Sequence, residues 1–562
     1  MPANVIPRPV RYSSAVKRSS APRTAGFPCA ASRAGTETDR ATSSENERNF
    51  IRLPWIAWNG ASKELIVTRF SPNSMRPAPR SEQIPLRYTR LVIELFFVLL
   101  ALFTPQTSKS QAAAQTSPSP ASFQTGVVLD QVVAANHPGQ SYALYLPSNY
   151  SPDHSWPVVF SFDPSAYGKA PVELQKEAAE QLGYILAASN NSRNGPRGPQ
   201  IEAANAMVQD VASRFPIDER RIYFAGFSGG ARVAAMLAVS CQCAAGVLLN
   251  GAGFLSGTEP PRGSTFAVFS AVGDFDFNYA ELIPLQDKLS QAGYPHWLRV
   301  FDGRHQWAPP EVMQEALAWF AVQAQKSHIA PRVGAFLNAQ FAKEVARAGS
   351  LEQAGDLFNA WRQNVQVAAT FDGLEDVAAV RAKVDSLEKE KSVREGAKRE
   401  RGEFDEQGRL TSAISDGLYS PMESSTTISE HTRTLVDQVR QLRSCTETEK
   451  RPERLRIYRR AVAAVFIDSL ESGSHFLEMK DYPSAICSFR CATEAVPEFE
   501  GAWRNLAVAY SLADRKKETL ATLRRARDVG KDPAAFTDWA LKEPALDRWR
   551  SVPEFLALLN LH

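Results

Sequence analysis

The stretch Arg221-Ile-Tyr-Phe-Ala-Gly226-Phe227-Ser228-Gly229-Gly230-Ala231 decides the fold of this protein. Residues 222–225 are apolar or aromatic and predict a short buried strand, whereas residues 231–238 are rich in alanine and predict a helix. The Gly-x-Ser-x-Gly junction between them therefore predicts a sharp turn from strand to helix. In such a turn the glycines avoid Cβ clashes, the serine hydroxyl is exposed, and the N–H of Gly229 points towards the atom that the hydroxyl attacks.

Apolar strands alternate with amphipathic helices on both sides of this turn. The pattern is typical of an α/β protein with a mostly parallel sheet covered by helices on both faces. An antiparallel pair of strands, 126–129 and 141–147, is expected before it. The further strands are expected near 157–162, 184–189, 220–226, 244–250, 265–272 and 297–302, and the helices near 171–182, 200–214, 229–240, 280–292 and 310–325.

The chain is long enough for roughly three domains, and its basic residues are unevenly distributed. The net charge is +3 over 562 residues. Residues 1–90 hold 15 Lys and Arg against 6 Asp and Glu, so residues 91–562 carry a net charge of −6. The basicity thus belongs to the leader, and nucleic-acid binding is not expected.

The first 122 residues are expected to serve export rather than the fold. Residues 1–86 predict a disordered basic leader, 87–114 a signal peptide and 115–122 a linker. The apolar core of the signal is about a dozen residues long and contains Glu94, so no stable membrane span is expected. Because a signal should begin near the start of a chain, Met75 is the expected true start, and a basic leader retained in the cell is the less economical alternative. The protein is expected to be periplasmic or secreted.

The alternation of strands and helices over 123–328 is followed by helices alone. Residues 329–465 predict a helical connecting region, in which the charged run 389–401 is expected to be a solvated face or long surface helix and 420–432 a loop. Residues 466–562 repeat with a period of 34, resemble tetratricopeptide repeats and are expected to end in a helical cap at 536–559. The matching pairs are Phe476 and Tyr510, Phe489 and Leu523, and Ala492 and Ala526.

The cysteines predict neither a metal site nor a cofactor. No two pairs have zinc-ligand spacing. Cys241 and Cys243 close an apolar helix and are expected to be small buried side chains rather than a redox pair. Cys487 and Cys491, four residues apart on one helix face, are interpreted in the same way.

A serine nucleophile needs a base and an acid, and both are expected on later strand ends. His305 follows a glycine-containing turn after the last core strand and is the expected base. Asp276, in the loop after strand 265–272, is the preferred acid. Asp274 in the same loop is an alternative that is more readily explained as a turn or cap residue. Asp302 is a third, less suitable because it is so near His305 in sequence.

The second donor of the oxyanion hole is expected in the turn after strand 157–162. This turn reads Phe162-Asp163-Pro164-Ser165, and Pro164 has no N–H. The donor is therefore Asp163 or Ser165, beside Gly229. The loss of one such donor costs roughly 3 kcal/mol of the barrier.

Five motifs together resemble the α/β-hydrolase superfamily over about 125–325, and within it the secreted carboxylesterases of the feruloyl-esterase, polyhydroxybutyrate-depolymerase and dienelactone-hydrolase kind. The resemblance implies that Ser228 is the nucleophile, Asp276 the acid and His305 the base. Many relatives carry His-Gly where this chain has Phe162-Asp163. The motifs are Tyr145-Leu-Pro147-Ser-Asn-Tyr150, Pro157-Val-Val-Phe-Ser-Phe162, Gly226-Phe-Ser228-Gly-Gly230, Gly273-Asp-Phe-Asp276 and Gly303-Arg-His305-Gln-Trp307.

These observations predict an exported serine hydrolase that cleaves small or polymeric carboxylic esters through an acyl-enzyme, without metal or organic cofactor. The short connection 251–264 leaves no room for a large lid. One alternative is a catalytically weak platform whose helical repeats bind a protein partner. Another is a serine peptidase, which uses the same three residues.

Overall fold

The structure is a computed structural model and describes residues 123–241, 243–255, 266–420 and 425–560. The predicted leader, signal peptide and linker lie outside the described residues, as does most of the connection at 251–264. Among the described helices, none is both long and apolar enough to cross a membrane.

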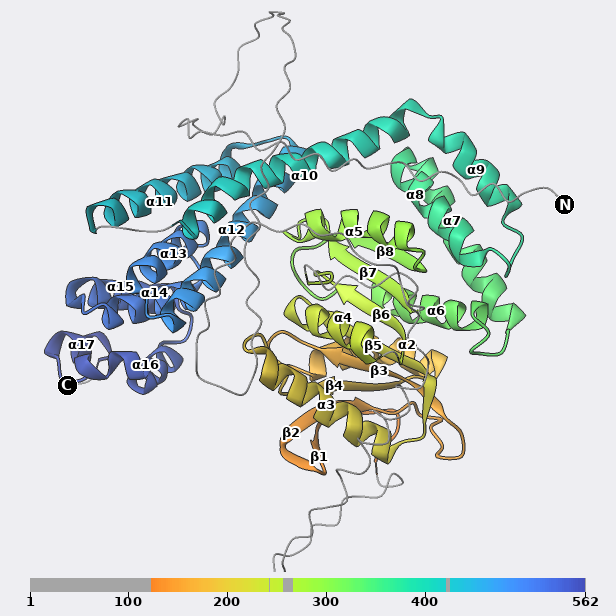
Figure 1. The fold of residues 1–562 in the computed structure, drawn as a ribbon, viewed down its shortest axis with the longest axis horizontal. Coiled ribbons are helices and arrows are strands. Elements are labelled where there is room, and N and C mark those ends of the chain that lie inside the picture. Colours follow the sequence, from red (N-terminus) through yellow and green to blue (C-terminus); the bar gives the residue numbers. More distant parts are fainter. Residues whose placement is uncertain (1–122, 242, 256–265, 421–424, 561–562) are drawn as a thin grey trace, which may run out of the picture. The chain divides into compact units, whose positions relative to one another are not determined.

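An eight-stranded sheet forms the first half of the described chain, in the order β1-β2-β4-β3-β5-β6-β7-β8 (Figure 1). β2 is antiparallel to both of its neighbours, and every pairing from β4 through β3 to β8 is parallel. The carboxyl ends of the parallel strands therefore meet at one edge. The strands are β1 (Val128–Ala134), β2 (His137–Tyr145), β3 (Trp156–Phe162), β4 (Ile185–Ser189), β5 (Ile217–Phe227), β6 (Ala244–Asn250), β7 (Ala267–Gly273) and β8 (His296–Phe301).

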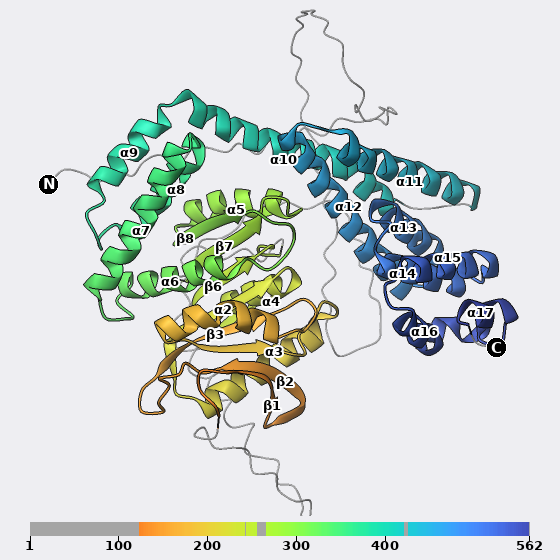
Figure 2. The ribbon, with the colours of Figure 1, turned by 180° about the vertical axis from the view of Figure 1, so that it is seen from behind.

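Helices cover both faces of this sheet, as Figures 1 and 2 show. The apolar side chains of α3, α4 and α5 pack on one face, and those of α2 and α6 on the other. Because both faces are covered, β3, β4 and β7 are buried along their whole length. The helices are α2 (Lys169–Leu182), α3 (Arg197–Arg214), α4 (Gly229–Cys241), α5 (Tyr279–Ala292) and α6 (Pro310–Lys326).

The predicted architecture is confirmed: this half is an α/β sheet, mostly parallel, with helices on both faces, and an all-α half follows. The predicted antiparallel pair is also confirmed, because Val128 pairs with Tyr145. The strand that precedes Ser228 is longer than expected, since β5 already begins at Ile217.

The second half of the chain is helical. The charged run 389–401 lies mostly in the long helix α10, but it is not solvated throughout, because Glu400 is buried. The expected loop at 420–432 is wrong from residue 425 onwards, because α11 begins there and buries Thr432 and Leu435. The helices are α7 (Gly334–Gln353), α8 (Leu357–Phe371), α9 (Ala378–Glu388), α10 (Lys391–Leu418), α11 (Ser425–Thr448), α12 (Pro452–Glu478), α13 (Tyr482–Ala495), α14 (Glu500–Leu512), α15 (Lys516–Val529), α16 (Pro533–Lys542), the 3-10 helix η2 (Pro544–Trp549) and α17 (Pro553–Leu558).

Close packing between the last helices explains the small residues of the 34-residue period. A Cβ on Gly473 of α12 would lie 2.5 Å from the ring of Phe489 on α13, so the two helices touch where glycine stands. Cys487 and Cys491 are buried free thiols, as the sequence indicated. The assignment to the tetratricopeptide family stays a prediction.

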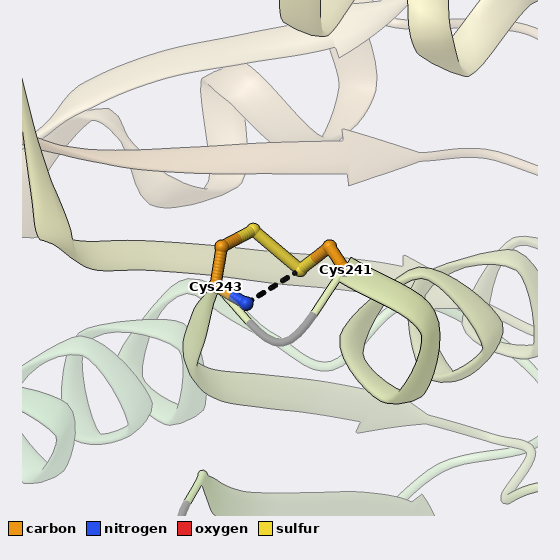
Figure 3. Close-up of a disulfide and its surroundings, with 2 residues drawn as sticks. All are labelled: Cys241 and Cys243. Carbon is orange, nitrogen blue, oxygen red and sulfur yellow. Dashed lines mark hydrogen bonds between the residues drawn. A yellow bond between two sulfur atoms is a disulfide. The ribbon is translucent and has the colours of Figure 1, made fainter. Parts of the chain in front are cut away.

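The interpretation of Cys241 and Cys243 as small buried side chains is wrong. Cys241 is exposed at the end of α4, and its sulfur is bonded to that of Cys243 in a disulfide (Figure 3). The N–H of Cys243 also lies 3.1 Å from the Cys241 sulfur.

Candidate active site

The turn from β5 into α4 holds Ser228 in a backbone conformation that residues other than glycine rarely adopt. Its φ is +53°, and its N–H donates to the carbonyl of Asn250 at 2.9 Å. The neighbouring glycines permit this turn, since a Cβ on Gly226 would lie 2.2 Å from the carbonyl oxygen of Gly230. A Cβ on Gly230 would in turn lie 2.0 Å from the carbonyl oxygen of Phe162. Backbone strain of this kind persists where the surroundings enforce it.

The structure brings Ser228, His305 and Asp276 together at the carboxyl edge of the sheet. Nε2 of His305 lies 2.8 Å from the Oγ of Ser228, and Nδ1 lies 2.9 and 3.0 Å from the two carboxylate oxygens of Asp276. The Asp276 side chain is fully buried, whereas that of His305 is 20% exposed. A hydroxyl, an imidazole and a carboxylate thus form one hydrogen-bonded chain, the arrangement that proton transfer from the hydroxyl requires.

The two alternative acids lie elsewhere. The Asp274 carboxylate accepts the N–H of Gly303 at 3.2 Å and so braces the neighbouring turn. Asp302 is exposed. Of the three candidates, Asp276 is the one whose carboxylate reaches the Nδ1 of His305.

Aromatic rings enclose His305 on two sides. The rings of Phe227 and Phe277 lie with their centroids 4.6 and 4.3 Å from that of the imidazole, and Phe227 also contacts Trp307. These rings come from the strand before Ser228 and from the loop after Asp276. They restrict the orientation of the imidazole and exclude water from its faces.

Three residues that sequence reasoning did not identify hold the site together. Asn250, fully buried at the end of β6, donates through Nδ2 to the Gln306 carbonyl at 3.0 Å and accepts the N–H of Ala308 at 2.6 Å. It therefore fixes the segment directly after His305. A polar residue followed by glycine at the end of an apolar strand was the available signal.

Gly251 and Asn278 are the other two. Gly251 has a φ of +63°, and a Cβ there would lie 3.0 Å from Oδ2 of Asp276 and 3.3 Å from Cε1 of His305. Asn278 donates through Nδ2 to the Gly251 carbonyl at 2.7 Å and through its N–H to Oδ1 of Asp276 at 2.8 Å. Together they leave room for the acid and orient its carboxylate.

The turn after β3 is organised by the carboxylate of Asp163. It accepts the N–H of Ser165 at 2.8 Å on one oxygen and the indole N–H of Trp307 at 2.8 Å on the other. The N–H of Ser165 is therefore engaged within the turn, which favours Asp163 over Ser165 as the second oxyanion donor. Gly229 opens α4, where a backbone N–H has no partner within the helix and the helix dipole favours negative charge.

Comparisons with known proteins add little to this geometry. No protein-family model matches the sequence, and no curated protein matches it. Among solved structures, a fluorophosphonate-binding serine hydrolase F of Staphylococcus aureus is similar at 14% identity and a TM-score of 0.29, over 34% of this chain and 97% of that one. An esterase of Pyrobaculum calidifontis is similar at 13% identity and a TM-score of 0.30, over 38% and 89%. Est1E of Butyrivibrio proteoclasticus is similar at 14% identity and a TM-score of 0.28, over 35% and 98%. Similarities this low carry no weight for function, which rests on the site itself.

Proposed function

We propose that this protein is an exported serine hydrolase that cleaves carboxylic esters through Ser228, His305 and Asp276. The observation that carries the proposal is the continuous chain of hydrogen bonds from the Ser228 hydroxyl through the imidazole to the buried Asp276 carboxylate. His305 is 77 residues from Ser228 and 29 residues from Asp276 in sequence, yet its imidazole contacts both side chains.

The proposed reaction has two halves. Ser228 Oγ attacks the acyl carbon while Nε2 of His305 takes its proton, and Asp276 stabilises the imidazolium that forms. The negative oxygen of the tetrahedral intermediate is held by the N–H groups of Gly229 and Asp163. The imidazolium then protonates the leaving alcohol, and an acyl-enzyme remains on Ser228. Water, deprotonated by His305, attacks that ester and frees the acid and the serine.

Export is supported by two features. Residues 87–114 have the charged flank, apolar core and small-residue exit of a signal peptide. The Cys241–Cys243 disulfide fits an oxidising compartment, since disulfides rarely persist in a reducing one. Sequencing the amino terminus of the mature protein tests this part of the proposal. An exported protein that still contains residues 87–114 would contradict it.

The test of catalysis compares the full chain with Ser228→Ala and with the surface control Ser151→Ala. Wild type and the control are expected to hydrolyse a short p-nitrophenyl ester and to be labelled by a fluorophosphonate probe, whereas Ser228→Ala is expected to lose both. If Ser228→Ala retains both behaviours, the assignment is wrong. Cleavage of peptide but not ester substrates would favour a serine peptidase, and neither activity would favour a platform for a protein partner.

A further inference from the structure

The loop that carries Asp276 is held from outside the hydrolase sheet. Arg460 on α12 donates through Nε to the Asp274 carbonyl at 2.7 Å, and Gln407 on α10 donates through Nε2 to the Phe277 carbonyl at 2.9 Å. The two acceptors lie on either side of Asp276, and the donors lie 186 and 130 residues away in sequence. The segment with the acid is thus held at two points by the helical half of the chain.

Arg460 is built into this contact. Its side chain is 2% exposed, its guanidinium lies 3.9 Å from the ring centroid of Tyr279, and Nη1 lies 3.2 Å from a carboxylate oxygen of Glu403. The Tyr279 hydroxyl in turn donates to Glu400 at 2.9 Å. A guanidinium is costly to bury unless its hydrogen bonds are satisfied, and the carbonyl of Asp274 is one of the acceptors that satisfy it.

The burial and hydrogen bonding of Gln407 also indicate that it serves to hold this loop. It is 6% exposed, and among the described residues its Oε1 has no hydrogen-bond partner. A buried amide that satisfies only one of its two polar ends contributes little to stability. Its one side-chain hydrogen bond in the described structure goes to the loop with the acid.

Beside these contacts the two halves of the chain are not packed tightly. A cavity of about 410 Å³ lies there, lined among others by Asp274, Tyr279, Arg299, Arg362, Glu400 and Arg460. On this side the loop is therefore supported by directional polar contacts, and beside them Phe404 contacts the ring of Tyr279 and Arg459 lies over that of Phe275. Loss of one such contact should be felt directly in the position of the loop.

We propose that Arg460 and Gln407 are positioning residues, through which the helical half of the chain holds the carboxylate of Asp276 against His305. The inference rests on the proposed function, since it gives Asp276 the role of the acid. Neither residue touches the reacting atoms. A displacement of about 1 Å in a catalytic group is enough to lower a rate roughly 100-fold, so such a clamp matters to turnover even though it is remote from the substrate.

The test uses the full chain with Arg460→Met, which keeps an unbranched apolar stem but removes the guanidinium group and its charge, and Gln407→Leu. The control is Arg440→Met, which breaks an exposed ion pair with Glu494 on the same helical half. We expect kcat for a p-nitrophenyl ester to fall about 10- to 100-fold in both variants, with KM unchanged. Arg460→Lys should recover part of the loss.

Unchanged KM together with partial rescue by Arg460→Lys separates positioning from general damage, because a displaced acid slows the chemical step without weakening substrate binding. Unchanged kcat in folded Arg460→Met and Gln407→Leu would overturn the proposal. If Arg460→Met does not fold, Gln407→Leu alone decides.

Amide hydrogen exchange of the peptide 273–279 gives a reading that does not depend on ester hydrolysis. We expect both variants to exchange faster there than Arg440→Met does. If wild type shows no esterase activity but the exchange still changes, the proposed function fails while the clamp stands. If wild type is active and neither exchange nor kcat changes in the variants, the clamp fails while the proposed function stands.

Discussion

Replacement of Asn250 by alanine should damage both stability and catalysis, because one buried side chain fixes the segment that follows His305. The change removes two hydrogen bonds, from Nδ2 to the Gln306 carbonyl and from the Ala308 N–H to Oδ1. Residue 306 is exposed, so water can replace the first bond, but Ala308 is fully buried and its N–H would stay without an acceptor. We therefore expect a loss of roughly 2–3 kcal/mol in the free energy of unfolding.

The same change should loosen His305 and lower kcat by about 10- to 100-fold, with little effect on KM. Urea unfolding and p-nitrophenyl ester kinetics measure the two effects. Asn359→Ala, which removes an exposed asparagine bonded to Asp356 on α8, is the control and should lose less than about 1 kcal/mol with normal kcat. Normal stability and turnover in Asn250→Ala would refute the view that this asparagine fixes the histidine segment.

Three further predictions test the acid, the interior and the disulfide. Asp276→Asn should lower kcat by about 10,000-fold, because an amide N–H facing Nδ1 forces the imidazole proton onto Nε2, and a stopped or single-turnover ester assay showing less than a 10-fold loss would contradict it. Burial raises the pKa of Asp287 to about 7, so the folded state is penalised as pH rises from about 4 to about 7. Asp287→Asn should therefore match wild type in urea unfolding near pH 4 and exceed it by about 1–2 kcal/mol at pH 8, less than the ~4 kcal/mol of the full shift because the group is partly open to water; an equal difference at both pH values would contradict this. Replacement of Cys241 and Cys243 by serine should cost no more than about 1.5 kcal/mol, because the bond closes a loop of only three residues, and a larger loss in the same unfolding experiment would show that it does more than restrain the unfolded chain.

Much of the α/β half was predictable because its signals are local. The period of apolar residues predicted the strands. The glycines around Ser228 predicted the turn, since a side chain at Gly226 or Gly230 would collide with the backbone. Asp276 and His305 could be proposed because parallel strands end at one edge of a sheet. The sequence could not show that Asn250 holds the histidine segment, because its partners Gln306 and Ala308 lie 56 and 58 residues further on.

Fewer features of the helical half were predicted correctly, because its polar contacts also join residues that are distant in sequence. The charged run 389–401 predicted a solvated face, yet Glu400 is buried against Tyr279 and Arg362, because partners distant in sequence satisfy its charge. Composition cannot reveal such a pairing, and it also did not reveal the disulfide between Cys241 and Cys243.

The sequence by itself determined the order of strands and helices and the residue types available for chemistry, because periodicity and turn preferences act between neighbours along the chain. Only the tertiary structure decided which carboxylate meets His305, which N–H in the turn after β3 is already engaged, and that α10 and α12 contact the loop that carries Asp276. The contacts of α10 and α12 join residues 130 and 186 apart in sequence at 2.9 and 2.7 Å, and a hydrogen bond at that range is set by packing rather than by spacing along the chain.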